Sequence, residues 1–596
     1  KIARLPIDHS VGPIADSIGG SDAALQRWQR FANEGLRRYD QTRNDAVLTW
    51  PNGVSRLSPY FHYGMLSPFR VAKEANKIGG KGAQKFIDEL TIWREIAHHF
   101  CWHCEDPDSL GELPNWAQAT LREHRDDQRD TTKTLRELAH AESGNALWDL
   151  CQRSLLVHGE LHNNLRMTWA KAIPEWTPSP EAALDALVTL NHRYALDGND
   201  PASYGGLLWA LGLFDRPFKP EQPVLGAVRP RSIAAHQKRL DMETYRSKIV
   251  KPQGKPLRIA VIGAGVSGLS AASALARNHH EVVVFEKSRG PGGRSATRRQ
   301  GDYQFNHGAQ YFTVRDERML RYIDDWQQEG TIEFLAKRTA RVERGQAAGL
   351  AANRQRYRGK GGMNQLCKSM AGGITLVTQT PIRQVEEDGD QWRLQTDQKD
   401  AESVSKPFDI VISSAPATQT AHLLRHAHPR ISGIAESVNL TPCWAVMLRT
   451  EAPHSEYDAG FVEGSPIAWL ATDQATDGSY CWVLHASTSW SEEHLEEEPE
   501  QIRDQLVTAF SLLTQLTVIE DSATAHRWRF ARVLNPLGDE CLFDPTTGIG
   551  ACGDWCHDGA RVESAWLSGQ AIAGRVLAKA FIDAETTVAP QSTLFD

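Results

Sequence analysis

Residues Arg258–Ser288 read RIAVIGAGVSGLSAASALARNHHEVVVFEKS, and this stretch decides the fold of the chain around it. An apolar, β-branched run at Ile259–Ile262 predicts a buried parallel strand. Three glycines follow in the G-x-G-x-x-G spacing, and an alanine-rich helical segment comes next. The first glycine of this spacing permits a tight turn, the second lets the backbone approach a pyrophosphate, and the third lets helix and strand pack closely. These glycines are Gly263, Gly265 and Gly268.

A second strand and an acidic residue complete the unit. Glu281–Phe285 predicts a strand, and Glu286 follows it directly, 23 residues after Gly263. A carboxylate at that position can accept hydrogen bonds from the adenosine ribose hydroxyls, and the helix N-terminus offers its unpaired N–H groups to the phosphates. Strand, glycines, helix, strand and acid in register therefore predict a dinucleotide site.

A second glycine-rich loop and a late strand favour FAD over NAD as the dinucleotide. The loop SRGPGGRSATRR, which includes Gly293 and Arg294, is flexible and basic. Near the other end of the chain, GIGACGDWCHDGARVESAWLSGQ predicts a strand, then Gly553 and Asp554, then a long helix from about Val562. We expect Asp554 to accept a ribityl hydroxyl of FAD. NAD sites seldom need a second phosphate-binding unit about 290 residues away.

The segment between these two units is rich in strand patterns. They predict a substrate subdomain on a mixed or antiparallel sheet. Residues 257–585 are thus predicted to form an α/β Rossmann-type FAD oxidoreductase domain, followed by a C-terminal tail at 586–596. The expected strands are Thr375–Thr378, Trp392–Thr396, Cys443–Arg449 and Tyr480–His485. Ile382–Glu387, together with FDIVISSAP from Phe408, resembles instead the return of the chain into the FAD domain in oxidases with two dinucleotide folds.

The bulk properties are those of a multidomain globular protein. A chain of 596 residues is too long for one core, and 41% hydrophobic and 23% charged residues are ordinary values. We find no apolar run of membrane-span length and no signal peptide, so no membrane partner is expected. Nine scattered cysteines fit a reducing cytoplasm, and the single CxxC, Cys101 with Cys104, has no second pair, so no metal site is expected.

Charge differs between the two halves of the chain. Residues 1–250 hold 31 basic and 31 acidic residues, so the remainder accounts for the whole net charge of −8. A nucleic-acid site in the first half would therefore need a local basic patch. The candidate is Arg229–Lys248, with six basic and two acidic residues, and a solvated helix face explains it equally well.

The first 249 residues show helical rather than strand periodicity. This pattern predicts an all-α domain, which a linker at residues 250–256 joins to the second domain. Glu89 and Trp93 are four positions apart and share a helix face, and Trp209 is expected beyond a loop, LDGNDPASYGG. The amphipathic segments are Ala23–Arg38, Pro68–Asn76, Gln84–His103, Ala146–Ile173 and Pro180–Leu196.

Six segments of this half carry a recognisable pattern: YDQTRNDA from Tyr39, SRLSPYFHYGMLSP from Ser55, FIDELTIWREIAHHFCWH from Phe86, LPNWAQATLREHRDD from Leu113, LWDLCQRSLLVHGELHNNLRMTWAKAIPEW from Leu147 and LNHRYALDGNDP from Leu190. In order and spacing, these segments resemble the flavin-binding helical domain of class II cyclobutane-pyrimidine-dimer photolyases. The sequence begins at Lys1 without a methionine. We expect it to lack the family's N-terminal α/β antenna domain, so no second chromophore is assigned.

The resemblance implies a non-covalent FAD deep in the helical bundle. In such a domain Arg166 and Asp197 would lie against the isoalloxazine, and Asn191 near its reactive edge. The phosphates would be held by the Tyr39 region and by one turn. That turn consists of Ser55, Arg56, Leu57 and Ser58.

The resemblance also implies damaged DNA, containing a pyrimidine dimer, as the partner of this half. The dimer must flip out of the stack to reach a buried flavin, and aromatic walls suit stacked bases. A carboxylic acid such as Glu89 can hydrogen-bond the extra electron density on a pyrimidine carbonyl. Two sets of residues are implied: Glu89, Trp93, Met167 and Trp209 around the dimer, and Trp169, Trp148 and Trp176 as the electron-transfer chain that regenerates reduced flavin.

Several positions depart from the family pattern. Glu160 occupies a basic position, His162 is followed by two asparagines, and Ala202-Ser203 replaces Asn-Gly. Pro174 is expected to interrupt the helix between Trp169 and Trp176. These changes touch the substrate pocket, and they leave open a cryptochrome-like photoreceptor, or a degenerate helical domain fused to an amine oxidase or desaturase.

Four segments of the second half carry a further pattern: FNHGAQYFTVRDE from Phe305, YRGKGGMNQLCKSM from Tyr357, WVLHASTSWSEEHLE from Trp482 and HRWRFA from His526. With these segments the second half resembles renalase and its bacterial relatives within the amine-oxidase superfamily. The resemblance implies hydride transfer from a dihydronicotinamide isomer, or from an amine, to a non-covalent FAD, which O2 reoxidises with release of peroxide. The candidate pocket residues are His307, Gln310, Tyr311, His485 and Arg527.

The sequence therefore predicts a fused, cytoplasmic flavoprotein with two non-covalent FAD sites. One half would repair pyrimidine dimers with light, and the other would be a renalase-like oxidase.

Overall fold

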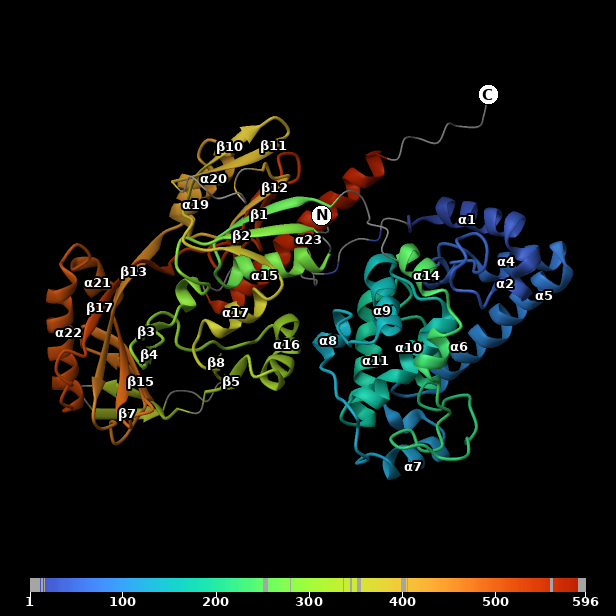
Figure 1. Ribbon diagram of the computed structural model, residues 1–596, viewed down its shortest axis with the longest axis horizontal. Helices are drawn as coiled ribbons and strands as arrows, with labels where there is room; N and C mark the ends of the chain where they lie inside the picture. The colour runs from blue at the N-terminus through green and yellow to red at the C-terminus, as the bar shows by residue number, and fades with distance from the viewer. Residues whose placement is uncertain are drawn as a thin grey trace. The chain divides into compact units, whose positions relative to one another are not determined.

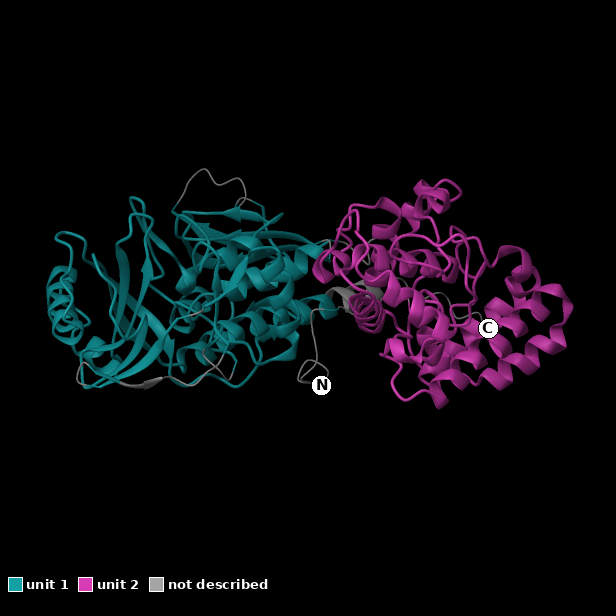
Figure 2. Cartoon of the chain, turned by 90° about the horizontal axis from the view of Figure 1, so that it is seen from below, with its two compact units in different colours: residues 1–12, 255–582 teal, residues 13–254, 583–596 magenta. Residues whose placement is uncertain are grey.

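The computed structural model describes residues 11, 14, 17–249, 256–278, 280–335, 337–343, 346–350, 355–397, 404, 406–557 and 561–587. The chain forms two compact units, residues 1–12 with 255–582 and residues 13–254 with 583–596 (Figure 2). Except for Pro256, the predicted linker at 250–256 lies outside the described residues, as does the tail from residue 588 on. Among the described residues, every helix is too short or too polar to cross a bilayer.

One unit is all-helical, as predicted, and residues 17–249 contain no named strand (Figure 1). A cluster of large side chains, including Trp28, Phe31 and Phe86, forms one of its cores. Its helices are α1 (Ser21–Glu34), η2 (Leu36–Arg38), α2 (Tyr39–Thr42), α3 (Ser58–His62), α4 (Pro68–Ile78), α5 (Gly80–Asp88), η3 (Glu89–Trp93), α6 (Arg94–His103), η4 (Leu110–Glu112), α7 (Asn115–Glu123), α8 (Leu135–Ala139), α9 (Ala146–His158), α10 (Asn163–Trp176), α11 (Pro180–Tyr194), α12 (Pro201–Trp209), α13 (Ile233–Gln237) and α14 (Met242–Ile249).

The prediction of one continuous helix over Ala146–Ile173 was wrong. Helix α9 ends at Gly159, which adopts the left-handed conformation with a φ of 60°, as is common after a helix C-terminus. Helix α10 then starts afresh, and the His162 side chain accepts a hydrogen bond from the N–H of Asn164. The break separates the two helices that carry Trp148 and Trp169.

Two further expectations about helices were also wrong. Helix α10 continues through Pro174 to Trp176, because the proline lies in the last turn and disrupts little of the remaining hydrogen-bond ladder. The stretch expected as a loop before Trp209, residues 196–206, is helical in its second part, because helix α12 begins at Pro201. Asp200 caps this helix by accepting a hydrogen bond from the N–H of Ala202, and Pro201 occupies its first position.

The other unit contains a six-stranded sheet of the Rossmann type. Its strand order is β18-β19-β12-β1-β2-β9, and all neighbours are parallel except β18 and β19. Alternate residues of β1 face two different cores: Ile259 and Val261 face one, and Ala260 and Ile262 face the other. Both faces of the sheet are thus covered, which explains the continuous apolar run. The strands are β1 (Arg258–Ile262), β2 (Glu281–Phe285), β9 (Thr375–Val377), β12 (Ile410–Ser413), β18 (Leu542–Asp544) and β19 (Ile549–Ala551).

A seven-stranded mixed sheet contains two of the four strands predicted for the substrate subdomain, Cys443–Arg449 and Tyr480–His485. The other two lie elsewhere: Thr375–Thr378 contributes to the Rossmann sheet, and Trp392–Thr396 lies in a separate two-stranded hairpin. The seven-stranded sheet has the order β17-β13-β16-β15-β14-β6-β7, and only β14 and β6 pair in parallel. Helix α22 (Pro499–Thr514) packs on one face through Ile502, Leu506 and Phe510. The strands are β6 (Thr339–Glu343), β7 (Gln346–Leu350), β13 (Leu440–Thr450), β14 (Ala459–Glu463), β15 (Ile467–Gln474), β16 (Tyr480–Ala486) and β17 (Thr524–Val533).

Three antiparallel two-stranded sheets and the remaining helices complete the described part of this unit. The pairs are β3 (Arg298–Gln300) with β4 (Tyr303–Phe305), β5 (Ile332–Phe334) with β8 (Tyr357–Gly359), and β10 (Ile382–Asp388) with β11 (Gln391–Thr396). The helices are α15 (Val266–Arg277), η5 (Gly293–Ser295), α16 (Glu317–Gln328), α17 (Gln365–Met370), α19 (Ala417–Leu424), α20 (Pro429–Glu436), α21 (Thr488–Glu493) and α23 (Val562–Thr587).

Candidate functional sites

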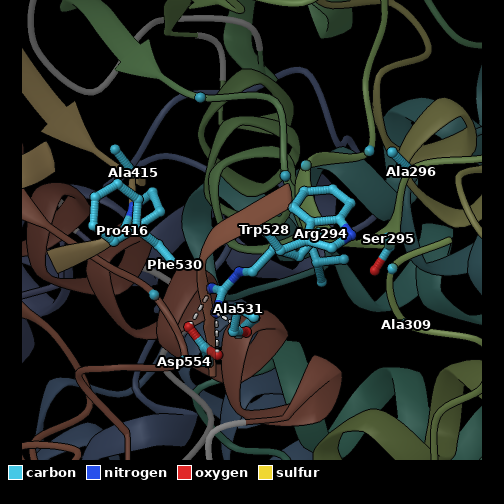
Figure 3. A pocket seen from close by; sticks show the side chains of 18 of the residues that line it. Arg294, Ser295, Ala296, Ala309, Ala415, Pro416, Trp528, Phe530, Ala531 and Asp554 are labelled. Carbon is cyan, nitrogen blue, oxygen red and sulfur yellow. Dashed lines mark hydrogen bonds and ion pairs between the residues drawn. The ribbon is translucent and has the colours of Figure 1, made fainter. Parts of the chain in front are cut away.

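A large cavity opens at the carboxyl ends of the parallel strands. Gly263, Glu286, Ser414 and Gly553 follow β1, β2, β12 and β19, and all four line this cavity of about 2760 Å³. Ligands of open parallel sheets bind at this edge, where neighbouring crossovers run in opposite directions. The cavity continues to the seven-stranded sheet, because His485 of β16 and Trp528 of β17 also line it (Figure 3).

The three glycines of the fingerprint have different physical roles. Gly263 has a φ of 111°, which L-residues rarely adopt. A Cβ on Gly268 would lie 2.2 Å from the carbonyl oxygen of Gly263, so only glycine permits this packing of α15 on β1. A Cβ on Gly265 would meet no protein atom within 4 Å, and the space beside it belongs to the cavity. Gly293 of the second loop approaches Gly265 closely, because its Cβ would lie 3.3 Å from the Cα of Gly265.

Glu286 holds the glycine turn from the end of β2. Its carboxylate is buried and accepts hydrogen bonds from the N–H of Ala264 at 2.9 Å and from the N–H of Ser288 at 2.8 Å. These bonds fix the side chain at the cavity wall. The predicted hydrogen bonds to the adenosine ribose need the carboxylate at this place.

Arg294 and Asp554 join the two predicted phosphate units across the cavity. The guanidinium donates to both carboxylate oxygens, with one distance of 3.0 Å, and also contacts the carbonyl oxygen of Ala531 at 3.4 Å (Figure 3). Asp554 therefore has a charged partner that the sequence did not indicate. The geometry fits an FAD-type cofactor: the glycine turns leave room for a pyrophosphate, and Arg294 brings positive charge to the same wall.

Three histidines gather at the end of the cavity formed by the seven-stranded sheet. Ala445 of β13 lies directly opposite both His485 of β16 and His526 of β17. The side chains of these two histidines therefore share one face of the sheet with Ala445. The His307 ring is 5.1 Å from the Trp528 ring and 4.9 Å from the His526 ring, measured between centroids. The carbonyl oxygen of His307 accepts hydrogen bonds from Trp528 Nε1 and His485 Nε2.

Burial keeps these imidazoles neutral. It lowers the pKa of His307 to about 3, with further contributions from His526, Arg298 and His485. The pKa values of His485 and His526 are lowered as well, first by burial and then by nearby arginines. Nδ1 of His307 is buried without a hydrogen-bond partner. The cluster can therefore donate or accept hydrogen bonds at the cavity wall without carrying charge.

This arrangement predicts a loss of stability in acid. Below pH 6.5 an unfolded histidine takes up a proton, whereas folded His307 stays neutral down to about pH 3. Lowering the pH from 7 to 4 should therefore cost on the order of 1 kcal/mol per pH unit through His307. Urea unfolding of the full chain at pH 7 and pH 5 measures this loss. His307→Gln should show a smaller loss, and the two proteins should respond alike between pH 8 and 9; equal losses at pH 5 would contradict the assignment.

The other three residues predicted for the oxidase pocket, Tyr311, Gln310 and Arg527, do not join the histidine cluster and have different partners. Tyr311 lines the cavity, and its ring is 5.6 Å from that of Trp469. Gln310 Oε1 accepts a hydrogen bond from Trp469 Nε1 at 3.2 Å. Arg527 also belongs to the cavity lining, but its guanidinium pairs with Glu496 and lies over Trp444, which belongs to the core beneath the sheet. The side chains of its neighbours on β17 turn toward the histidine cluster, because successive strand residues point to opposite faces.

In the helical unit, the three polar residues predicted to lie at the isoalloxazine come together. Arg166 of α10 donates to Oδ1 of buried Asn191 at 3.1 Å and pairs with Asp197 at 3.5 Å. Ser203, one of the departures from the family pattern, accepts a third hydrogen bond from Arg166 and donates to the Asp197 carbonyl oxygen. A guanidinium, an amide and a carboxylate thus lie in one cluster, and these groups can form hydrogen bonds with the polar edge of a flavin ring.

The residues predicted around the DNA lesion come from three helical segments. The indoles of Trp93 and Trp209 stack with 5.1 Å between ring centroids, and Trp93 is 42% exposed, so this pair can present a ring to a ligand. Glu89 Oε1 is 2.9 Å from Arg43 and 2.7 Å from Lys85. Both Glu89 and Trp93 lie in η3, a π-helical turn inside the continuous α5–α6 helix. Met167 follows Arg166 on α10 and is half-buried.

The three predicted electron-transfer tryptophans are in contact. Trp148 stacks on Trp169 at 5.9 Å and 12°, and meets Trp176 edge-on at 5.5 Å. Trp148 and Trp169 are fully buried, while Trp176 is partly exposed. The order from inside to outside is therefore Trp169, Trp148, Trp176. Pro174 does not disturb this contact.

The predicted phosphate turn contains an ion pair that the sequence did not indicate. Arg56 has a φ of 56°, and its guanidinium is 2.6 Å from the Glu160 carboxylate. Leu57 is buried, and Ser58 begins α3. The carbonyl oxygen of Ser55 accepts a hydrogen bond from an indole, that of Trp50.

Tyr39 belongs to the aromatic core rather than to the turn. Its ring meets those of Phe31 and Phe86 edge-on, at 6.0 and 5.4 Å. Burial raises the pKa of its hydroxyl, and the nearby Glu89 carboxylate raises it further.

Part of the basic segment 229–248 is engaged inside the unit. Arg231 donates to Thr168 and Asn164, and Lys248 donates to two backbone carbonyl oxygens at 2.9 and 2.8 Å. These cations hold the segment against the helices, which weakens the interpretation of this segment as a DNA-binding patch.

Fold and site together define an α/β protein of the Rossmann type joined to an all-helical unit. Residues 261–326 match the family of NAD(P)-binding Rossmann-like domains, and residues 332–577 match the flavin-containing amine oxidoreductases. The N-terminal region matches deoxyribodipyrimidine photolyases. These matches support FAD as a cofactor.

Two such photolyases illustrate the extent of the match. The protein from Oryza sativa subsp. japonica is 37% identical over 238 residues, which is 39% of this chain and 46% of the relative. The protein from Methanothermobacter thermautotrophicus is 34% identical over 231 residues, 39% of this chain and 51% of the relative. The chain thus spans about half the length of the curated relatives it matches. A solved putrescine oxidase triple mutant aligns with 54% of this chain and 99% of its own, at 14% identity and a TM-score of 0.43.

Proposed function

We propose that this chain is a fused flavoprotein that repairs cyclobutane pyrimidine dimers with light in its helical unit and acts as a renalase-like oxidase in its α/β unit. The observation that carries the proposal is the convergence of two separate sets of residues. In one unit, Arg166, Asn191 and Asp197 meet near a chain of three tryptophans. In the other, glycine turns and three neutral histidines line one cavity. When bound, FAD would supply an electron to the lesion in the first site and accept a hydride in the second.

In the repair site the protein's own residues would bind and polarise the flipped lesion. The stacked pair Trp93 and Trp209 offers an exposed aromatic surface, which suits unstacked bases. Glu89, whose carboxylate Arg43 and Lys85 fix in place, would accept a hydrogen bond from a pyrimidine N–H. A dimer costs less to extrude than an intact pair, because it is already poorly stacked.

Illumination of the reduced protein with a thymine-dimer oligonucleotide tests the repair function. The dimer content should fall in the light and stay constant in the dark. Trp93→Ala should weaken binding of the lesion by about 1–3 kcal/mol, because it removes one stacked ring. Trp102→Ala is the matched control, since Trp102 lies on the same continuous helix and is 85% exposed. Unchanged dimer content in a protein that binds flavin and responds to light would favour the photoreceptor alternative.

In the oxidase site the residues would orient a hydride donor rather than perform acid–base chemistry. Hydride transfer depends mainly on positioning. Trp528 and Tyr311 provide flat surfaces, and the neutral His307 and His526 provide hydrogen-bonding edges. A dihydronicotinamide would lose a hydride and leave as the aromatic pyridinium, and O2 with one further proton would leave as hydrogen peroxide.

Peroxide release on mixing the air-saturated protein with a dihydronicotinamide isomer tests the oxidase function. Peroxide formed should equal donor consumed, one to one. Putrescine serves as the comparison, since an ordinary amine oxidase would consume it in preference. Flavin quantitation on the same sample should give two FAD per chain, whereas one FAD would favour the degenerate helical domain.

A further inference from the structure

The cavity of the α/β unit is far more basic than the half of the chain that forms it. From residue 251 onward the chain holds more acidic than basic residues, 43 against 35. Fifteen arginine and lysine residues line the cavity, whereas only four carboxylates do. The pyrophosphate of one FAD neutralises about two of these positive charges. The excess points to a second anionic occupant, because converging cations that face a cleft focus a positive potential there.

Two of these arginines flank the histidine cluster without a carboxylate partner. Among the described residues, neither Arg298 nor Arg532 has an ion pair or a side-chain hydrogen bond. Both guanidiniums lie near the cluster, because Arg298 acts electrostatically on His307 and His526, and Arg532 acts on His485. Several other lining cations are paired with carboxylates, as Arg294 is with Asp554 and Arg561 with Glu563.

The position of both arginines follows from strand pairing. Arg298 lies in β3, opposite Phe305 of β4, and the chain reaches His307 two residues later. Arg532 lies opposite Thr441 of β13, beyond an irregularity in the β13–β17 pairing that separates it from Trp528. The site is thus built on two sheets.

We infer that Arg298 and Arg532 bind an anionic group, carboxylate or phosphate, of the oxidase substrate. The inference rests on the proposed oxidase function and narrows its substrate class: the reduced donor carries negative charge, and a protonated amine is repelled. The neutral histidines near the arginines add hydrogen-bond donors without competing for the anion. A guanidinium suits this task because it offers paired N–H donors to either kind of oxyanion.

Two hydride donors that differ by a single phosphate group test the inference. Dihydronicotinamide mononucleotide carries a phosphate that the corresponding riboside lacks. The phosphate-bearing donor should have a kcat/KM higher by about tenfold or more, since a hydrogen bond to a charged group contributes about 1.5–3 kcal/mol. Arg298→Gln and Arg532→Gln should each remove most of this preference. Arg503→Gln is the control, because Arg503 is paired with Asp504 and does not line the cavity.

Calorimetric titration of the holoprotein with inorganic phosphate and with pyruvate tests the site without turnover and distinguishes the two anion sources. At least one of the two should bind, with an affinity that falls about tenfold in either glutamine variant. If neither donor is oxidised but an anion binds through the arginines, the oxidase proposal fails and the anion site stands. Equal kcat/KM for both donors, together with no anion binding in the unaltered protein, would overturn the inference.

Discussion

Gly265→Val should release FAD from the α/β unit while leaving the unit folded. A side chain at this position meets no protein atom within 4 Å, and the backbone, with a φ of −82°, is open to any L-residue. The valine would instead fill the space through which the backbone approaches the pyrophosphate. We expect affinity for FAD at this site to fall by about a hundredfold or more, as for the loss of about 3 kcal/mol of phosphate binding. Flavin per chain after gel filtration measures the effect.

Gly290→Ala is the matched control for this substitution. Gly290 lies in the second glycine loop and lines the same cavity, and a Cβ there also meets nothing within 4 Å. It should keep its flavin. If the chain carries two FAD, Gly265→Val should retain one of them. Full flavin content in this variant would show that the fingerprint does not hold the cofactor.

Trp148→Phe should abolish most of the photoreduction of flavin in the helical unit. Trp148 is the middle ring of the three and contacts both Trp169 and Trp176. Without the indole, an electron must cross the gap between the outer two rings, and transfer rates fall steeply with distance. We expect the rate of photoreduction with an external reductant to drop by more than an order of magnitude. Absorption spectra recorded during blue illumination measure the rate at which the flavin is reduced.

Trp28→Phe is the control for loss of a buried indole. Trp28 is as buried as Trp148 and also donates a hydrogen bond through its ring nitrogen, to Glu74. Both variants should keep their flavin, and only Trp148→Phe should lose photoreduction. Equal rates in the two variants would exclude an electron path through Trp148.

The parts of this molecule that depend on local sequence could be predicted. The run Ile259–Ile262 is buried on both faces and could only be a central strand, and Glu286 follows from its fixed distance to the glycines. Helix α12 could also have been predicted, since Asp200 and Pro201 form an ordinary helix start. This stretch was nevertheless interpreted as a loop.

The contacts that depend on strand register or on distant segments could not be predicted. His485 and His526 are far apart in the sequence and meet because Ala445 pairs with both. The same holds for Arg294 with Asp554 and for Arg56 with Glu160, in which each partner had been interpreted as part of a separate motif. No local sequence pattern indicates that the two members of such a pair are in contact.

The π-helical turn at Glu89–Trp93 makes this stretch sensitive to its length more than to its composition. A π turn holds one residue more than an α turn, and each residue of an α-helix rotates the remainder of the helix by about 100°. The turn already accommodates one extra residue, so inserting a second one here would rotate the rest of the helix and swing Arg94 away from Asp200, to which it donates two hydrogen bonds. Single-residue insertions in Glu89–Trp93 should therefore be far more harmful than most substitutions at the same positions, whereas deletion of one residue would restore a regular helix.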